Sequence, residues 1–199
     1  MTNLPVTGKF SITATYGQKG PYWKTYHKGM DFVCLNHNIY STVNGTVRVV
    51  AWDESGWGQY ISIGDDKGNR HLFCHLVRGS QRVKVGQRVD PLTIIGTMGD
   101  SGNATGVHLH YELHNADDKD IDPSTFLGIP NKIGTYNSSE FGRYADDDEI
   151  ASWARSAVYA VTGAGLMLGD DLGRFRPRDP ITRQELAVVL DRLLDKVRW

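Results

Sequence analysis

The sequence predicts a two-domain β + α protein, in which a mostly antiparallel β domain precedes a small module of two helices. Short apolar and polar alternations separated by turn residues recur from residue 8 to about residue 113. No helical period is present before about residue 120, whereas the period after residue 140 is that of amphipathic helices. A chain of 199 residues is long enough for one medium-sized domain and a small second one.

Composition and hydropathy argue against three features: nucleic-acid binding, a membrane span and a secretory signal. A net charge of -1 argues against nucleic acid as the main partner, because phosphate neutralisation requires a concentrated basic face. The chain has no apolar run of about 18 residues, so we expect no membrane span. The first residues, Met1 to Pro5, have neither a basic nor an apolar stretch, so we expect no secretory signal.

The N-terminal domain, expected at residues 1–128, is a series of strands. Residues 27–35 favour a turn that runs into a strand, because Gly29 is followed by β-rich residues. A polar, turn-rich stretch at 129–140 is expected to be a linker. The other predicted strands are 8–17, 45–52, 59–63, 69–76, 83–86, 92–96 and 107–113.

The C-terminal module, expected at residues 141–199, contains two predicted helices. The apolar stripe of the first runs from Ile150 to Val161, with the acidic run 146–148 suited to its start and Gly163 and Gly165 to its end. The second begins with a capping box at 182–185 and carries a leucine-rich stripe from 186 to 194. Because two helices bury little core alone, we expect this module to pack on something else, including copies of itself.

Two histidines point to the chemistry of the N-terminal domain. His108 and His110 alternate along a predicted strand and therefore share one face. Neighbouring imidazoles can share a metal, or one can bind the metal while the other handles a proton. Further candidates upstream are His27 and Asp31, four residues apart, and His75.

The residues alone leave two ligand sets open. His27, Asp31, His108 and His110 together would close a tetrahedral site and make it structural. We favour an open zinc site with three ligands, one water and two non-ligand histidines. Zinc would lower the pKa of the water towards about 7, and the free histidines, His75 among them, would take its proton or stabilise the oxyanion.

The remaining histidines receive structural interpretations. His37 lies in a turn and His114 follows the predicted end of a strand, so neither is expected to function. Strand alternation places His71 on the face of His75, where it is a candidate for lining the groove.

The two cysteines and one glycine-rich loop complete the N-terminal domain. Cys34 and Cys74 are expected to be reduced, buried and turned away from the site, with a disulfide between neighbouring strands as the alternative. The loop 101–106 runs into a strand and lacks the Lys-Ser/Thr of a phosphate loop. We therefore expect it to form one wall of the groove.

Three separated motifs resemble the signatures of the lysostaphin-type (LytM-like) zinc endopeptidases: His27–Asp31, Phe73–Leu76 and Gly102–Glu112. The resemblance covers about residues 8–127. It implies a small antiparallel β domain of the duplicated-hybrid-motif kind, with one zinc per chain, that cuts peptide bonds in bacterial peptidoglycan.

Motif position also assigns roles to residues. The resemblance implies His27, Asp31 and His110 as zinc ligands and His75 and His108 as the catalytic pair. An aromatic hydroxyl near the first motif assists the oxyanion in some members of this family. Tyr22 is the candidate here, with Trp23 and Tyr26 close to it in sequence.

The C-terminal module resembles a single S-layer homology repeat, on the motifs 165–169, 173–177 and 181–187 and on Trp153. Such repeats bind secondary cell-wall polysaccharide in grooves between three repeats, which implies Arg183 and Trp153 as contacts. An arginine fork suits a carboxylate-bearing sugar. Trp153 also lies on the apolar stripe of the first helix, so it is equally a core candidate. Because only one repeat is present, we expect a homotrimer built through residues 141–199.

Together these features predict a peptidoglycan hydrolase that resembles a bacteriophage endolysin. We expect it to be made in the host cytoplasm and to act on the host cell wall after release. The alternatives are a bacterial autolysin, a carboxypeptidase with the same ligands, and a non-catalytic wall-binding or activator protein. Two cross-links fit the expectation equally: a D-alanyl bond to a diamino acid, and a glycine-rich bridge.

Overall fold

A computed structural model of the chain describes residues 4–91, 93–138, 144, 146–163, 166–170, 172 and 174–197. Several predicted features lie outside these residues: the linker end at 139–140, the module start at 141, Leu92 and Gly165. The N-terminal domain comprises β1 (Lys9–Ala14), β2 (Gly29–Cys34), β3 (Asn38–Tyr40), β4 (Gly45–Asp53), β5 (Gly58–Asp65), β6 (Arg70–Leu76), β7 (Arg88–Val89), β8 (Ile94–Thr97), β9 (Leu109–His114), β10 (Asp120–Ile121), α1 (Pro123–Leu127) and β11 (Gly134–Asn137). The C-terminal part has η2 (Asp147–Glu149), α2 (Ser152–Gly163) and α3 (Arg183–Val197).

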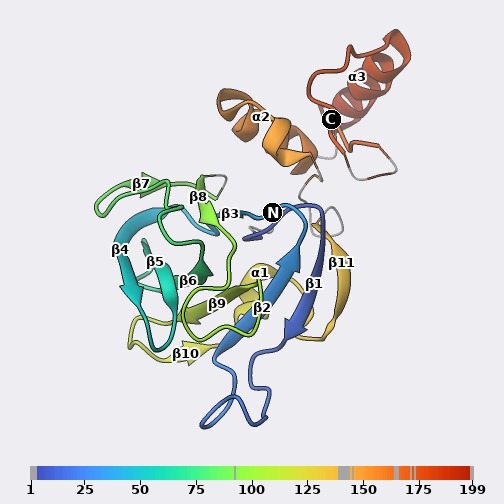
Figure 1. The fold of residues 1–199 in the computed structure, drawn as a ribbon. Helices are drawn as coiled ribbons and strands as arrows, with labels where there is room; N and C mark the ends of the chain where they lie inside the picture. Colours follow the sequence, from blue (N-terminus) through green and yellow to red (C-terminus); the bar gives the residue numbers. More distant parts are fainter. Residues whose placement is uncertain are drawn as a thin grey trace.

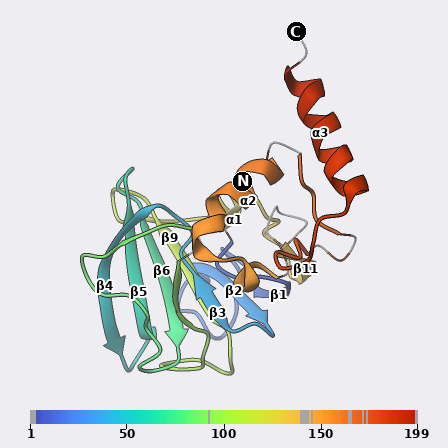
Figure 2. The ribbon, with the colours of Figure 1, turned by 90° about the horizontal axis from the view of Figure 1, so that it is seen from above.

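One antiparallel sheet organises the N-terminal domain. Its strands follow the order β11-β1-β2-β9-β6-β5-β4-β7, with β10 pairing to β9, while β3 and β8 form a separate pair. Figures 1 and 2 show the strands gathered in one body, with α2 and α3 outside the sheet. The predicted fold class, a mostly antiparallel β domain followed by a small helical module, is confirmed.

Strand β9 lies between β2 and β6 and separates the core from the polar face. Leu109 and Tyr111 point into a buried apolar cluster with Phe10, Phe32 and Phe73. The alternate residues of β9 therefore face the other way. Gly29 permits the approach of β2, since a Cβ there would lie 2.3 Å from the carbonyl oxygen of Tyr111 and 2.9 Å from His110 Cε1.

Most predicted strands are present. One predicted strand is absent, and several short elements of the structure were not predicted. Residues 83–86 form no strand, because a turn in which Gln87 N–H donates to the Lys84 carbonyl breaks the extended backbone. The strands β3, β7 and β10 and the five-residue helix α1 have too few residues for a periodic pattern. Helix α1 begins at a capped Asp122 and ends at Gly128, whose φ is 64°.

A further strand lies inside the predicted linker. Gly134–Asn137 form β11, which pairs antiparallel with β1, and the hydroxyls of Ser11 and Thr135 are 2.9 Å apart. As an edge strand, β11 is only partly buried, and Tyr136 is its residue that packs against the core. The sheet of the N-terminal domain therefore continues to residue 137.

The C-terminal module has the two predicted helices and a very small core. Tyr144, Ile150 and Val158 are its buried apolar residues among those described, with Ala154 and Phe175 packed against them. The predicted capping box is confirmed, because Glu185 N–H donates to Thr182 Oγ1 and Thr182 N–H donates to Glu185 Oε2.

Two expectations for this module are corrected. Asp146 makes no side-chain cap; its carboxylate accepts from the backbone N–H groups of Phe175 and Arg176, and η2 intervenes before α2. Trp153 is 87% exposed, so it is not a core residue of this chain. Among the described helices, none combines the length and apolar character that a membrane span requires.

Both cysteines are buried free thiols, so the disulfide alternative is wrong. Cys34 belongs to the apolar core, as expected. Cys74 is paired directly with His110 on β9 and therefore lies on the same sheet face as that histidine. The expectation that Cys74 turns away from the site is wrong, because the strand alternation on which it rested breaks at His75, whose φ is 61°.

The same break explains why His71 does not line the groove. His71 is fully buried, and its Nδ1 lies 2.7 Å from the Tyr111 hydroxyl. Its Nε2 lies 3.6 Å from Asp65 Oδ2. Desolvation lowers the pKa of His71 to about 4, although the Asp65 carboxylate opposes that shift. His71 is therefore a neutral structural histidine.

This buried imidazole makes stability dependent on pH. Between pH 6.5 and 4 the unfolded chain binds a proton at His71 that the folded chain does not, so the free energy of unfolding falls as the pH falls. The contribution is at most about 3 kcal/mol. We expect His71→Asn to make the decrease shallower in urea unfolding curves, and His37→Asn, at an exposed position, to leave it as in the wild type. Equal slopes for wild type and His71→Asn would contradict this assignment.

Candidate active site

A groove of about 780 Å3 crosses one end of the N-terminal domain. Its walls come from the loop 18–28, from β2 and β9, and from residues around His75. Asn103, Thr105 and Gly106 line it as well, so the expectation that the loop 101–106 shapes the groove is confirmed.

Three predicted ligands meet in this groove. His27 Nε2 lies 2.9 Å from His110 Nδ1, and Asp31 Oδ1 lies 3.1 Å from the former and 2.8 Å from the latter. Asp31 and His110 are direct partners across β2 and β9, and His27 precedes β2 by two residues. The structure therefore brings His27, Asp31 and His110 to one point, as the motifs imply.

Hydrogen bonds elsewhere on the two rings fix which nitrogen faces that point. His27 Nδ1 donates to the Thr15 carbonyl at 2.9 Å, so its Nε2 keeps a free lone pair. His110 Nε2 donates to Glu112 Oε1 at 2.9 Å, so its Nδ1 keeps one too. Two lone pairs and a carboxylate oxygen repel each other at this distance unless a cation lies between them.

The donor set therefore fits a divalent metal. Tetrahedral ligands at about 2.1 Å from a metal are about 3.4 Å apart, so a metal would require the 2.8 to 3.1 Å edges of this triangle to lengthen slightly. Without a metal, a proton takes the same place. Desolvation lowers the pKa of His110, but hydrogen bonds to Asp31 and Glu112 outweigh it and raise the pKa to about 9. Burial raises the pKa of Asp31, yet hydrogen bonds from His110 and His27 hold it well below its usual range.

His75 and His108 lie beside this cluster as a second pair. Their ring centroids are 4.7 Å apart, and His75 is 5.8 Å from the ring of His110. Each donates Nδ1–H to a backbone carbonyl at 2.8 Å, His75 to Ser101 and His108 to Gly106. Nε2 is therefore the acceptor nitrogen of both rings, and that of His108 lies 3.8 Å from Asp31 Oδ2.

Desolvation lowers the pKa of His75 to about 4, although the hydrogen bond that His75 donates to the Ser101 carbonyl opposes this shift. His75 is therefore neutral near pH 7. His75 has a positive φ, which interrupts the alternation of side chains along β6. Its ring therefore lies on the groove side of the sheet. A neutral imidazole next to a metal cluster is suited to accept a proton from water.

The loop 18–28 supplies an aromatic wall. Trp23 packs on the metal-facing His27 with ring centroids 4.8 Å apart, and Tyr22 meets Trp23 edge to face at 6.1 Å. Tyr22 is 76% exposed and lines the groove, so its role in oxyanion stabilisation stays a prediction.

Glu112 is the functional residue that the motif analysis missed. Its side chain is buried, with Oε1 accepting from His110 Nε2 and from Trp57 Nε1. Its Oε2 accepts from His114 Nε2 at 2.8 Å, so His114 is the buried last residue of β9 and does not lie beyond the strand as predicted. Alternation along β9 already placed positions 108, 110, 112 and 114 on one face, which was the signal available in the sequence.

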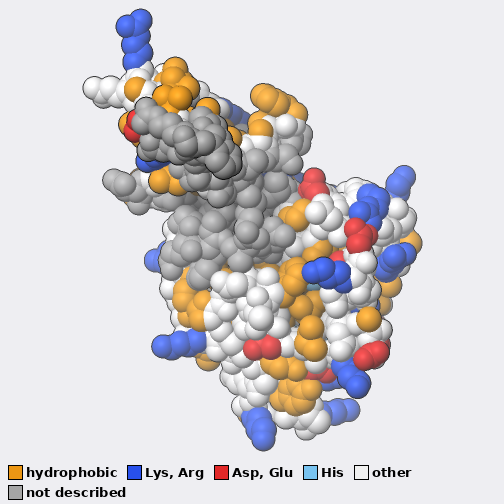
Figure 3. Space-filling model, turned by 180° about the vertical axis from the view of Figure 1, so that it is seen from behind, with side chains coloured by type: hydrophobic (Ala, Val, Ile, Leu, Met, Phe, Trp, Pro, Cys, Tyr) orange, Lys and Arg blue, Asp and Glu red, His pale blue; other side chains and the backbone are white. Residues whose placement is uncertain are grey.

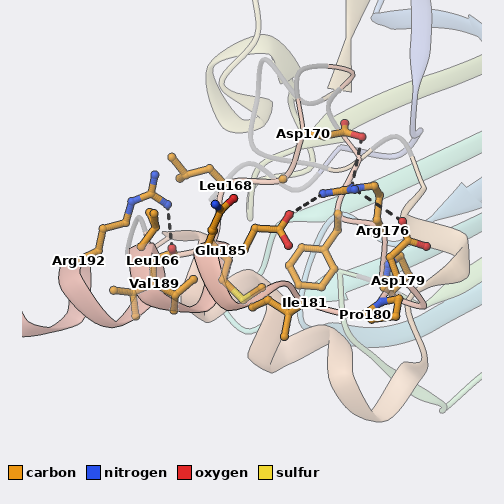
Figure 4. Close-up of a pocket in the computed structure, with 16 residues that line it drawn as sticks. Leu166, Leu168, Asp170, Arg176, Asp179, Pro180, Ile181, Glu185, Val189 and Arg192 are labelled. Carbon is orange, nitrogen blue, oxygen red and sulfur yellow. Dashed lines mark hydrogen bonds and ion pairs between the residues drawn. The ribbon is translucent and has the colours of Figure 1, made fainter.

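The C-terminal module has a pocket of its own, of about 800 Å3, between α3 and the segment 166–181. Figure 4 shows Arg176 among Asp170, Asp179 and Glu185, with closest N···O distances of 3.6, 3.7 and 3.1 Å. Arg192 Nη1 donates to the Leu166 carbonyl. Trp153 and Arg183 are exposed but do not belong to this pocket lining, so their predicted sugar contacts would lie on another surface.

A β domain with a two-histidine, one-aspartate cluster and two free imidazoles has the arrangement of a metal-dependent hydrolase. Residues 25–123 match peptidase family M23, and residues 143–187 match the S-layer homology domain. The chain thus contains an M23 peptidase domain followed by an S-layer homology domain, and the predicted resemblances of both parts are confirmed.

Relatives and solved structures agree with these matches. The chain is 32% identical over 120 residues to the L-Ala--D-Glu endopeptidase of Bacillus subtilis, covering 56% of this chain and 36% of that protein. It is 34% identical over 97 residues to the endolysin of Staphylococcus phage 2638A, covering 47% and 20%. The lysostaphin catalytic domain of Staphylococcus simulans superposes with a TM-score of 0.55 at 26% identity, covering 60% of this chain and 92% of that one. The chain spans about a fifth to a third of the first curated relatives it matches.

Glu112 should control metal affinity by holding the His110 tautomer. We expect Glu112→Leu to weaken metal binding about 10- to 100-fold, measured by competition with a chelating dye, and Glu112→Gln to fall between it and the wild type. Glu54→Gln, at an exposed turn, is the control. Unchanged affinity in a folded Glu112→Leu protein would remove this role.

Proposed function

We propose that this chain is a zinc-dependent peptidoglycan endopeptidase whose S-layer homology module holds it at the bacterial cell wall. The observation that carries the proposal is the convergence of His27, Asp31 and His110 beside two histidines with acceptor Nε2 atoms in an open groove. The printed names of the Bacillus and phage relatives support a wall-directed endopeptidase.

The donor chemistry favours zinc, because two imidazole nitrogens and one carboxylate oxygen match a catalytic zinc site. When bound, zinc polarises the scissile carbonyl and lowers the pKa of water at the open position. The protein holds both ligand tautomers through the Thr15 carbonyl and the Glu112 carboxylate.

Proton transfer falls to His75 and His108. Their backbone-anchored rings present Nε2 into the groove, where one accepts the proton of the attacking water and the pair delivers it to the leaving amine. Tyr22 lines the same groove and is the proposed hydrogen-bond donor to the oxyanion.

Wall attachment falls to the C-terminal module. Exposed Arg183 and Trp153 are the proposed contacts for a secondary cell-wall polysaccharide. A guanidinium binds a sugar carboxylate bidentately, and an indole face packs on a sugar ring.

We further propose a phage origin, in which the enzyme waits in the host cytoplasm and acts on the host wall after release. The similarity to a staphylococcal phage endolysin supports this proposal.

Removing the metal or the proton acceptor should abolish activity without unfolding the chain. We expect EDTA treatment, and separately His75→Ala, to reduce release of soluble peptides from purified peptidoglycan at least about 100-fold. Circular dichroism should stay native for His75→Ala, and zinc should restore activity only to the EDTA-treated wild type. His37→Ala, outside the groove, is the matched control. Full turnover after chelation, or in His75→Ala, would reject the mechanism.

The module should assemble chains into a trimer. Leu186, Leu190 and Leu194 follow each other at one-turn spacing on α3 and are exposed, Leu190 by 50%. Figure 2 shows α3 projecting away from the sheet. We expect light scattering to give three times the mass of a single chain, and Leu190→Glu to give the mass of one. A single-chain mass for the wild type at working concentration would contradict the trimer.

A further inference from the structure

We propose that Lys19, Lys24 and Lys28 form a basic wall of the groove that selects carboxylate-bearing stem peptides over neutral glycine bridges. All three lysines are exposed groove residues. The inference rests on the proposed endopeptidase function and adds to it the substrate class.

The lysines belong to a loop that is closed at the metal ligand. Gly17 N–H donates to the His27 carbonyl at 2.9 Å, and His27 N–H donates to the Gln18 carbonyl at 2.8 Å. These two hydrogen bonds close the base of the loop. Lys19 and Lys28 lie directly at this base, because they are the residues that follow Gln18 and His27 in sequence.

The far end of the loop folds back on the same ligand. Trp23 packs on the His27 ring, and a Cβ at Gly20 would lie 3.1 Å from Trp23, which leaves little room for a larger residue there. Lys24 follows Trp23 in sequence. Lys19 and Lys24 are therefore next in sequence to residues that contact His27, and Lys28 is next to His27 itself.

The charge of this wall is not cancelled inside the groove. The acidic residues of the groove lining are Asp31 and Glu112, and both are committed to hydrogen bonds with histidines. Lys28 Nζ lies 4.0 Å from Asp120 Oδ1, a carboxylate whose Oδ2 also accepts from the Tyr26 hydroxyl. Lys19 and Lys24 thus supply most of the available positive charge.

The segment 103–107 adds no charge to the groove lining. Asn103, Thr105, Gly106 and Val107 line the groove there. Figure 3 shows Lys and Arg side chains projecting from the lower end of the molecule, the end where the loop between β1 and β2 projects in Figure 1. A bound peptide therefore meets the lysine charges of the groove along the loop 18–28, which also gives it a preferred orientation.

The two cross-links left open by the sequence differ in this property. A stem peptide carries carboxylates on its glutamate residue and at free carboxyl termini, whereas the inner residues of a glycine bridge carry none. Exposed lysines interact with carboxylates at a range that salt screens, so the preference must weaken with ionic strength.

The test compares three peptides on the full-length zinc-loaded protein: a stem-peptide substrate with a free glutamate carboxylate, its carboxamide twin, and pentaglycine. For the wild type we expect KM for the carboxylate peptide to be at least fivefold below that of the carboxamide. In the double variant Lys19→Gln with Lys24→Gln, KM for the carboxylate peptide should rise about 5- to 10-fold with kcat within twofold, and the carboxamide should change little. Lys67→Gln, on the exposed turn between β5 and β6, should behave as the wild type.

Fluorescence anisotropy with labelled forms of the same peptides separates this inference from the proposed function, because it needs no turnover. Preferential binding of the carboxylate form, lost in the double variant and in 0.5 M salt, supports the basic wall even if no peptide is cleaved. Equal wild-type affinity for the carboxylate and the carboxamide, or an equal loss for both in the double variant, overturns it.

Discussion

The pairing of Asp31 with His110 across β2 and β9 is the contact on which the site depends. It places a carboxylate oxygen 2.8 Å from an imidazole nitrogen and lets His27 enter from the start of β2. Gly29 makes this approach sterically feasible. The core residues of β9 face the opposite side, so the same strand anchors the domain and presents the ligands.

Around that contact, each of the four imidazoles has one nitrogen whose hydrogen-bond partner lies outside the ligand cluster. Backbone carbonyls of Thr15, Ser101 and Gly106 anchor three of the rings, and the Glu112 carboxylate anchors the fourth. Because main-chain carbonyls hold most of the tautomers, the site is built into the fold rather than into a few replaceable side chains. The other nitrogens of His27 and His110 meet beside Asp31, where a metal ion could bind, and the rings of His75 and His108 lie next to this cluster.

Much of this arrangement was predictable from the sequence, for reasons that differ between residues. Alternation and motif spacing were enough to bring His27, Asp31 and His110 together and to predict most strands of the sheet. They failed at His75, where one left-handed residue moves Cys74 and His71 to unexpected faces. They also failed at β11, because this four-residue edge strand places a single large apolar side chain, Tyr136, against the core, which is too little for a recognisable alternation. Alternation placed Glu112 on the same face as His110. The sequence did not predict its role, because a carboxylate that only hydrogen-bonds to a candidate ligand has no characteristic spacing.

The loop between β1 and β2 leaves and rejoins the sheet at one point, where Gln18 and His27 are joined by a hydrogen bond. A segment with such neighbouring ends can be exchanged as a cassette, since its replacement leaves the strands on either side in place. Residues 19–26 could therefore be replaced while Gln18 and His27 keep their places at the base of the loop, although Trp23 would have to be retained for its contact with the His27 ring.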